Sequence, residues 1–332
     1  RVMVNEGMSV VFITHKLREV MSVCDRISVL RNGRNAASLP RAEANEEILV
    51  KAMVGEGLDV HQSLIFSGAG AVQAGLPAGD KPVLRVEHLQ VIDENGGAVI
   101  NDCSFEVHEK EILGLAGVAG NGQHELAESL LGIRPIAGGQ VWVGATAVAA
   151  AQTRDLLAQG VTYIPEDRLN DGFLPKATVA HNLILGYHRQ SPYRSRNGLL
   201  NWPAIYEAAR RQISAYTIKT TGPHEVAGNL SGGNIQRVML ARAFSRPARL
   251  LVAHNPTRGL DIHSMEFVYT RLLEQKQCGL ATLLLSEDLD ELMLLCNRIA
   301  VIYRGQIMGI LPRDRFDKYQ LGRLMSGVKL DE

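Results

Sequence analysis

The chain has 332 residues, of which 46% are hydrophobic, and its 35 basic residues balance 35 acidic ones. This length allows two domains, or one domain with part of another. A formal net charge of zero excludes the basic excess of proteins that bind nucleic acid through its phosphates, and no apolar run is long enough to cross a bilayer. The four cysteines form no CxxC pair and the histidines do not cluster, so we expect no metal site and a reduced, cytosolic compartment.

Two segments of the chain match one another without a gap. Residues 9–41, SVVFITHKLREVMSVCDRISVLRNGRNAASLPR, align with residues 281–313, ATLLLSEDLDELMLLCNRIAVIYRGQIMGILPR. The offset is 272 residues throughout, so that residue 15 aligns with residue 287. This period is far too long for a solenoid repeat, and it indicates a duplicated domain instead.

Both copies predict the same elements in chain order: an apolar strand, a helix, a second strand, a glycine turn and a further short strand. In the first copy these are residues 10–14, 18–24 and 26–31 with the turn at Gly33, and in the second they are residues 282–286, 290–296 and 298–303 with the turn at Gly305. We therefore expect residues 1–56 to be the end of one domain and residues 83–332 to be a complete second one. Residues 57–82 are rich in Gly, Ala and Pro and are interpreted as a linker, with an irregular loop inside a single domain as the alternative.

The second domain contains a glycine-rich loop, GVAGNGQHEL, at residues 117–126. It follows an apolar strand at 111–117 and leads into a predicted helix at 124–132. Strand, glycine loop and helix are the context of a phosphate-binding loop, in which backbone N–H groups face an anion. The glycines of the pattern are Gly117, Gly120 and Gly122, but Gln123 and His124 stand where such a loop carries Lys and then Ser or Thr. Taken alone, the segment is equally consistent with a tight strand-to-helix turn that binds no ligand.

Two later motifs decide between these interpretations. LSGGNIQRVMLARAF (230–244) places Ser231, Gly232 and Gly233 before a helix, with Ser231 as a candidate N-cap. RLLVAHNPTRGLD (249–261) is an apolar strand followed by a polar turn. In this order the motifs resemble the LSGGQ signature and the DEPTxGLD motif of ATP-binding-cassette (ABC) ATPases, with Asn234 in place of Gln. His254 and Asn255 replace Asp and Glu of the second motif, while Asp261 matches. An ordinary capped helix start is the alternative for the first motif.

The chain as a whole resembles the ATP-binding subunit of an ABC importer with two fused cassettes. TYIPEDR at 162–168 points to the simple-sugar and nucleoside-type group. The implied fold is α/β, a P-loop NTPase-type ABC cassette with a mixed core sheet, an antiparallel β subdomain and a helical subdomain at about 167–228. The implied partners are membrane permease subunits, the first cassette of the same polypeptide and, indirectly, a substrate-binding protein, but no nucleic acid. The implied location is peripheral, on the inner face of the cell membrane.

The resemblance also implies that the ATP site of the second cassette is degenerate. A neutral amide replaces the lysine that pairs with the phosphates, an imidazole replaces the hydroxyl that binds Mg²⁺, and the metal-linked acid and catalytic base are lost. Carboxylates stand where the family has a Gln that touches the metal and a His that contacts the γ-phosphate. The six positions are Gln123, His124, Glu166, His254, Asn255 and Glu287. We expect ATP and Mg²⁺ to belong to the full-length assembly, and this chain by itself to have little affinity for ATP, binding it weakly or not at all, and no ATPase activity.

The first copy keeps one functional position. His15, the repeat partner of Glu287, is the family-type switch His for the γ-phosphate, with a capping or surface His as the alternative. Because paired cassettes of this family face each other head to tail, residues Ser231–Asn234 would serve the ATP of the first cassette in trans, and Asp261 would lie at the cassette interface. Two other hypotheses stay open: a non-hydrolytic docking or structural module, and a soluble twin-cassette ATPase not linked to transport. The neutral charge and the short Gly/Ala-rich linker argue against the second of these.

Overall fold

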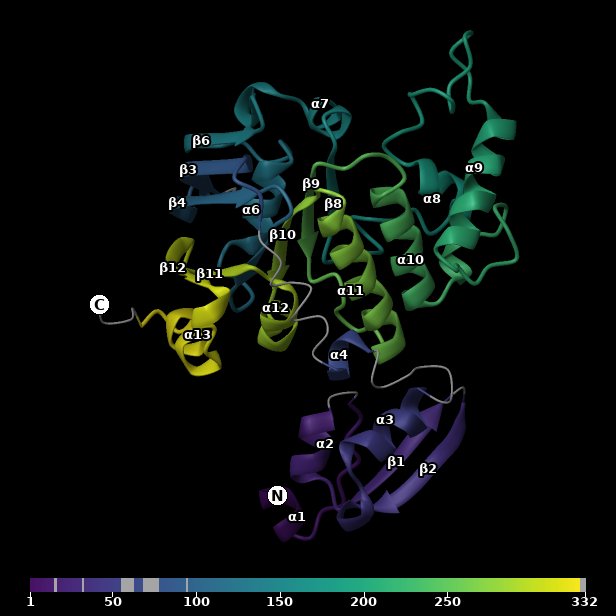
Figure 1. Cartoon of the computed structure of the whole chain (residues 1–332), viewed down its shortest axis with the longest axis vertical. Helices are drawn as coiled ribbons and strands as arrows, with labels where there is room; N and C mark the ends of the chain where they lie inside the picture. The colour runs from purple at the N-terminus through teal and green to yellow at the C-terminus, as the bar shows by residue number, and fades with distance from the viewer. Residues whose placement is uncertain (15–16, 32, 55–62, 68–77, 94, 329–332) are drawn as a thin grey trace. The chain divides into compact units, whose positions relative to one another are not determined.

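A computed structural model describes residues 1–14, 17–31, 33–54, 63–67, 78–93 and 95–328. They form two compact units, which are described separately (Figure 1). Unit 1 comprises Arg1–Ala69 with Asp261–Phe267, and unit 2 comprises Gly70–Leu260 with Val268–Glu332. No helix in the described part of the chain is long and apolar enough to span a membrane. His15, the candidate switch residue, lies outside the described residues.

Unit 1 is built around an antiparallel hairpin, β1 (Arg26–Arg31) and β2 (Arg34–Pro40). Ile27, Val29, Ala44 and Leu49 form its small core. The surrounding helices are α1 (Val2–Asn5), α2 (Leu17–Val23), η1 (Arg41–Glu43), α3 (Glu46–Val54) and α4 (Leu64–Ser67). The predicted strand at residues 10–14 is wrong, because these residues have no regular structure in the described unit. A strand is stable only when its N–H and C=O groups are paired with a neighbour.

The sequence repeat is matched by a structural repeat. Helix α12 (Leu289–Leu295) begins and ends 272 residues after α2. The strands β11 (Arg298–Tyr303) and β12 (Gln306–Pro312) likewise begin and end 272 residues after β1 and β2. Even the irregularity recurs, since the pairing register shifts between Val29 and Leu30 in one hairpin and between Val301 and Ile302 in the other. The two copies therefore share local structure as well as sequence.

Unit 2 contains two sheets. The larger has the strand order β12-β11-β5-β10-β9-β8, parallel except for the antiparallel edge strand β12, so it is a mixed sheet. Its remaining strands are β5 (Ile112–Ala116), β8 (Val161–Ile164), β9 (Leu250–His254) and β10 (Ala281–Ser286). The smaller sheet is antiparallel with the order β4-β3-β6-β7, from β3 (Pro82–Ile92), β4 (Ala98–His108), β6 (Gly138–Val143) and β7 (Thr146–Ala147).

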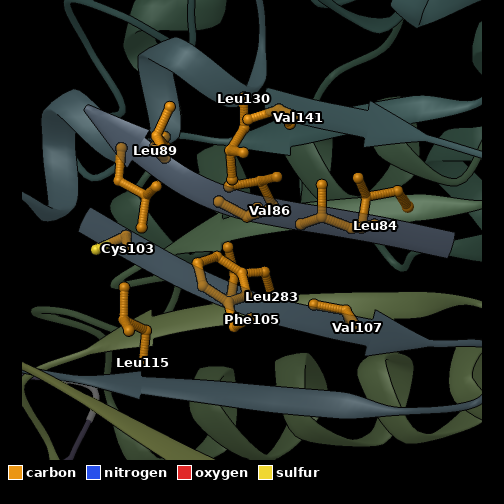
Figure 2. Close-up of a cluster of buried hydrophobic side chains, with 14 of the residues drawn as sticks. Leu84, Val86, Leu89, Cys103, Phe105, Val107, Leu115, Leu130, Val141 and Leu283 are labelled. Carbon is orange, nitrogen blue, oxygen red and sulfur yellow. The ribbon is translucent and has the colours of Figure 1, made fainter. Parts of the chain in front are cut away.

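The core of unit 2 lies between the two sheets. Leu84 and Val86 of β3 and Phe105 of β4 lie in one buried cluster with Leu115 of β5 and Leu283 of β10 (Figure 2). Every residue of β5, β9 and β10 is buried, which explains why these strands are continuous apolar runs without alternation. Burying one such Leu side chain stabilises the fold by about 2 kcal/mol.

Helices surround these sheets. α8 (Val179–Ile184) packs against α9 (Trp202–Ala215) and α10 (Gly232–Ala243), and α8 and α9 lie inside the predicted helical subdomain (Figure 1). The remaining helices are α6 (Gln123–Leu130), η2 (Val148–Ala150), α7 (Thr153–Ala158), η3 (Ala227–Asn229), α11 (Ile262–Gln277), η4 (Arg313–Arg315) and α13 (Lys318–Met325). The predicted fold class, with a mixed sheet, an antiparallel sheet and a helical region, is confirmed.

Candidate functional site

The glycine loop joins β5 to α6, as predicted. Gly120 and Gly122 have positive φ angles of 85° and 100°, in the region that favours glycine. A Cβ atom on Gly122 would lie 2.6 Å from the Cδ1 atom of Ile100 and 2.7 Å from the carbonyl oxygen of Val99. Backbone strain and lack of space therefore both require glycine at the N-cap of α6.

The side chain of Gln123 folds back into this loop and is buried. Its Nε2 donates to the carbonyl oxygen of Val118 at 3.0 Å, and its Oε1 accepts from the backbone N–H of Asn121 at 3.1 Å. Asn121 adds a second donor to Val118 and accepts the backbone N–H of Arg304 at 2.7 Å. A backbone N–H that would face an anion in an open loop is thus bonded within the loop itself.

His254, at the end of β9, is a buried imidazole next to the loop. Its ring centroid lies 6.4 Å from that of His124, and its Nε2 lies 3.5 Å from an Oε2 of Glu166. Burial lowers the pKa of His254 below 6.5, assisted by His124 and Arg258, while Glu166 opposes the shift. The ring is therefore neutral at pH 7. Its Nδ1 has no hydrogen-bond partner among the residues that the structure describes.

Glu166 is the anion at the centre of this cluster. Its Oε1 accepts a hydrogen bond from the Nδ2 of Asn255 at 2.9 Å, and the Arg258 guanidinium pairs with the same carboxylate. The Oδ1 of Asn255 accepts the backbone N–H of Glu287 at 3.2 Å, whereas the side chain of Glu287 is exposed. These contacts bring together the predicted positions on three strand ends. Arg258, which was not predicted, is visible in the sequence as the only cation of the turn HNPTRGLD.

Comparison with known proteins shows which family part of the chain resembles and which fold it has. Residues 100–258 match the ABC transporter family. A nucleotide-free ATP-binding cassette of an ABC transporter superposes with a TM-score of 0.59 at 20% identity, covering 70% of this chain and 92% of that one. A cassette in its ADP conformation superposes with a TM-score of 0.58 at 19% identity, covering 74% and 95%. The chain has the fold of an ABC-type cassette.

Curated relatives of the cassette align over nearly the whole chain. The glucose import ATP-binding protein TsgD13 of Haloferax volcanii is 35% identical over 97% of this chain and 57% of that protein. The nucleoside import ATP-binding protein NupA of Lactococcus lactis is 33% identical over 99% of this chain and 63% of that protein. The chain thus spans about three fifths of the length of the relatives that it matches.

The segment LSGG (230–233), which was predicted to be the signature segment, leads into α10, with Ser231 at the N-cap as predicted. The Ser231 side chain makes no capping bond; it accepts a hydrogen bond from the Nδ2 of Asn234 at 2.8 Å. The Oδ1 of Asn234 accepts the backbone N–H of Lys219 at 2.8 Å, which ties the segment to the chain before it. Ser231 and Gly232 are exposed, and the first N–H groups of an α-helix have no partner within the helix.

Two other carboxylates of the cassette sequence have structural partners. Asp261 accepts hydrogen bonds from the backbone N–H and the hydroxyl of Ser264, at 2.9 and 3.1 Å. Glu291 was not predicted as a site residue: it is buried and accepts hydroxyl hydrogen bonds from Thr257 at 2.6 Å and Ser286 at 2.5 Å. Burial raises the pKa of Glu291. The described residues contain no group of three or more His, Cys, Asp or Glu side chains that would hold a metal ion.

Proposed function

We propose that the chain is part of the ATP-binding subunit of an importer for a sugar or a nucleoside. The observation that carries this is the alignment with glucose and nucleoside import ATP-binding proteins over 97% and 99% of the chain. Residues 83–332 are then a second cassette, residues 57–82 the linker and residues 1–56 the end of a first cassette. The shared hairpin register of the two copies supports this division.

The proposal includes a degenerate ATP site in the second cassette, because its residues do not fit a magnesium nucleotide. The Gln123 amide is bonded into the loop and carries no charge for the phosphates. His254 is a neutral imidazole where an anionic partner of Mg²⁺ would be needed. The Glu166 carboxylate already accepts a hydrogen bond from the Asn255 amide and pairs with the Arg258 guanidinium, and its negative charge would repel a phosphate group.

The working surface of this cassette is then its signature segment. Exposed N–H groups at the start of α10 and the positive end of its helix dipole suit the phosphates of an ATP held by the first cassette. Ser231, Gly232, Gly233 and Asn234 act in trans on that ATP, with His15 as its switch residue and Asp261 at the cassette interface. Permease subunits dock on the region of α8 and α9, which makes the assembly peripheral to the inner face of the membrane, and a substrate-binding protein delivers the solute.

Calorimetric titration of the chain with ATP and Mg²⁺ tests the degenerate site. We expect no saturable binding in the micromolar range and no ATP hydrolysis, because neither a phosphate-pairing cation nor a metal-binding carboxylate is available. The Glu166→Gln variant serves as a control, since it removes the repelling carboxylate but restores no lysine, and we expect it to remain inactive. Micromolar binding of Mg-ATP to the unchanged chain contradicts the proposal.

The role in trans is tested in the complete transporter that contains this chain. Gly232→Asp places a carboxylate at the signature and should reduce solute-stimulated ATP hydrolysis at least about 100-fold, as expected when a preorganised phosphate contact is lost. Gln123→Ala, in the degenerate loop of the same cassette, is the matched control and should leave turnover within about twofold, since its loop holds no reacting phosphate. The reverse pattern, with turnover lost in Gln123→Ala and kept in Gly232→Asp, means that the second cassette uses its own loop.

The alternative of a non-hydrolytic docking module has one observation in its favour. Gln123 is bonded within its own loop, and Glu166 pairs with Asn255 and Arg258, so these side chains have partners within the protein itself. A transporter whose ATP turnover is unchanged in Gly232→Asp would favour this alternative over the role in trans.

A further inference from the structure

The chain between α8 and α9 contains a hairpin-like turn at residues 193–201. Two backbone hydrogen bonds of 2.8 Å close it: the N–H of Ser195 donates to the carbonyl oxygen of Leu199, and the N–H of Asn201 donates to that of Tyr193. An isolated antiparallel bridge lies between these two bonds. The connection that carries the turn extends away from the helices on either side of it (Figure 1). The side chains of this turn are therefore held on a protruding, hydrogen-bonded segment of unit 2.

The protein surface around this turn is basic. Residues 172–206 contain no Asp or Glu, although acidic and basic residues are equal in number in the whole chain. Arg189, Arg194 and Arg196 are exposed. Arg246, which follows α10, adds a fourth guanidinium, because its Nη2 donates to a carbonyl oxygen of this connection at 2.8 Å. In the part of the chain that the structure describes, no carboxylate pairs with any of these four side chains.

Exposed apolar side chains accompany these charges. Leu199 is 67% exposed and Leu200 is 37% exposed, whereas Tyr193 at the start of the turn is buried and anchors it to the rest of unit 2. Basic residues beside exposed apolar ones are typical of surfaces that bind a bilayer interface, where apolar side chains enter the headgroup boundary and cations stay at the phosphates. A protruding segment suits such a flat surface, whereas peptides are recognised in grooves or along sheet edges.

We propose that residues 188–200, the basic turn, bind the surface of a membrane that contains anionic lipids. The guanidinium groups pair with lipid phosphates through N–H···O hydrogen bonds, and the two leucines enter the headgroup region. The negative surface potential of such a membrane attracts the turn over about one Debye length, about 8 Å at physiological ionic strength. This inference goes beyond the proposed import function and does not rest on it, because a lipid surface can be bound without a permease.

Co-sedimentation of the intact chain with lipid vesicles tests this surface. Vesicles of phosphatidylcholine and phosphatidylglycerol in equal amounts should bind the chain, and vesicles of phosphatidylcholine alone should not. Binding should weaken as sodium chloride is added, because salt screens exposed charges. The triple variant Arg189→Gln, Arg194→Gln, Arg196→Gln should bind the mixed vesicles about 100-fold more weakly, since each basic residue near an anionic surface strengthens binding about fivefold.

A matched triple variant removes the same number of charges elsewhere. Arg34→Gln, Arg154→Gln and Arg315→Gln change exposed positions outside the basic turn, and together they should leave vesicle binding within about twofold, because charges more than a Debye length from the lipid surface are screened. Leu199→Ser with Leu200→Ser should weaken binding about fivefold, since apolar contact with the bilayer is lost. Urea unfolding should give the same stability for each variant, because all of these side chains lie at the surface.

Equal binding to both kinds of vesicle overturns the proposal, because a basic surface should distinguish them. Exposed apolar residues elsewhere, such as Val11 and Ile13, would then account for the binding. The absence of binding to either kind of vesicle also overturns it. Equal binding of the two triple variants has the same consequence, since the lipid-binding surface then lies elsewhere or binding follows the net charge of the chain alone.

Discussion

Residues 9–41 and 281–313 repeat one another in sequence and in their hairpins, but several of their equivalent apolar side chains differ widely in exposure. Leu283 and Leu285 of β10 are fully buried between β5 and β9, whereas their partners Val11 and Ile13 are 89% and 92% exposed. The difference extends to the hairpin, since Ile302 is fully buried and its partner Leu30 is 76% exposed. Similar sequences therefore reach the same local fold with very different burial.

This comparison separates elements that are stabilised by contacts within their own segment from elements that need neighbouring strands. A hairpin carries its own turn and its own cross-strand contacts, so β1 and β2 form with the register of β11 and β12. A central strand depends on its two neighbours, and residues 10–14 have none in the described unit. Under the proposed domain organisation, the exposed side chains of Val11 and Ile13 would pack against the rest of the first cassette.

The largest difference in stability is expected when an aspartate is introduced at equivalent positions of the two copies. Leu285→Asp buries a charge at the centre of the sheet and should destabilise unit 2 by more than about 4 kcal/mol. Ile13→Asp changes an exposed position and should cost no more than about 0.5 kcal/mol. Tryptophan fluorescence during urea unfolding follows unit 2, which contains both Trp142 and Trp202, and hydrogen exchange with mass spectrometry follows unit 1.

The same pair of variants sharpens the domain proposal. In a longer protein that contains a complete first cassette, Ile13→Asp should become as destabilising as Leu285→Asp, because both residues then lie in a central strand. Equal tolerance of Ile13→Asp in the chain and in the longer protein would mean that residues 10–14 do not occupy the position of β10.

A smaller effect is expected at the two hairpin turns. Gly33 and Gly305 have nearly the same φ, 73° and 74°. A Cβ atom on Gly33 would meet nothing within 4 Å, but one on Gly305 would lie 2.2 Å from the carbonyl oxygen of Val99 and 2.9 Å from the Cα of Ile100. Gly33→Ala should therefore cost only the backbone strain, about 1 kcal/mol. Gly305→Ala adds a clash with backbone and should cost about 3 kcal/mol in urea unfolding, and equal costs at both turns would contradict this account.

Sequence patterns predicted the elements that are decided locally or by long apolar runs. The strands at 112–116 and 250–254, the helix after Gly122 and the N-cap position of Ser231 lie where the sequence placed them. The strand at 10–14 was predicted from the same kind of apolar pattern and is absent. An apolar pattern indicates that a segment is suited to burial between neighbouring strands, but it does not show whether those strands are present.

The site was predicted as a set of positions and not as a set of contacts. Motif order brought Gln123, Glu166 and His254 to one end of the sheet, because strand ends meet there. The bond from Gln123 into its own loop and the pairing of Glu166 with Arg258 depend on side-chain conformations that no spacing encodes. Glu291 was missed because a glutamate on an amphipathic helix is normally an exposed residue.

The smallest expected effect on stability concerns a hydrogen bond that is found at equivalent positions in each copy. The Thr14 hydroxyl donates to Glu19 at 2.8 Å in the exposed copy, and the equivalent Ser286 hydroxyl donates to Glu291 at 2.5 Å in the buried copy. Burial raises the pKa of Glu291, so the folded state binds its proton more tightly than the unfolded state. The stability that follows from this is complete below the unfolded-state pKa of about 4.5 and is lost as the pH rises through the folded-state pKa.

Glu291→Gln should therefore flatten the pH dependence of unit 2, because the amide keeps an acceptor for the hydroxyls of Ser286 and Thr257 and does not titrate. Between pH 5 and pH 8 the unchanged chain should lose stability relative to the variant, by about 1.4 kcal/mol for each unit between the two pKa values of Glu291. Urea unfolding followed by tryptophan fluorescence at both pH values measures this difference. Glu19→Gln changes the equivalent carboxylate, which lies in unit 1, and it is the matched control for a change in unit 2. If both variants give the profile of the unchanged chain, the shared hydrogen bond determines the behaviour of Glu291 more than its burial does.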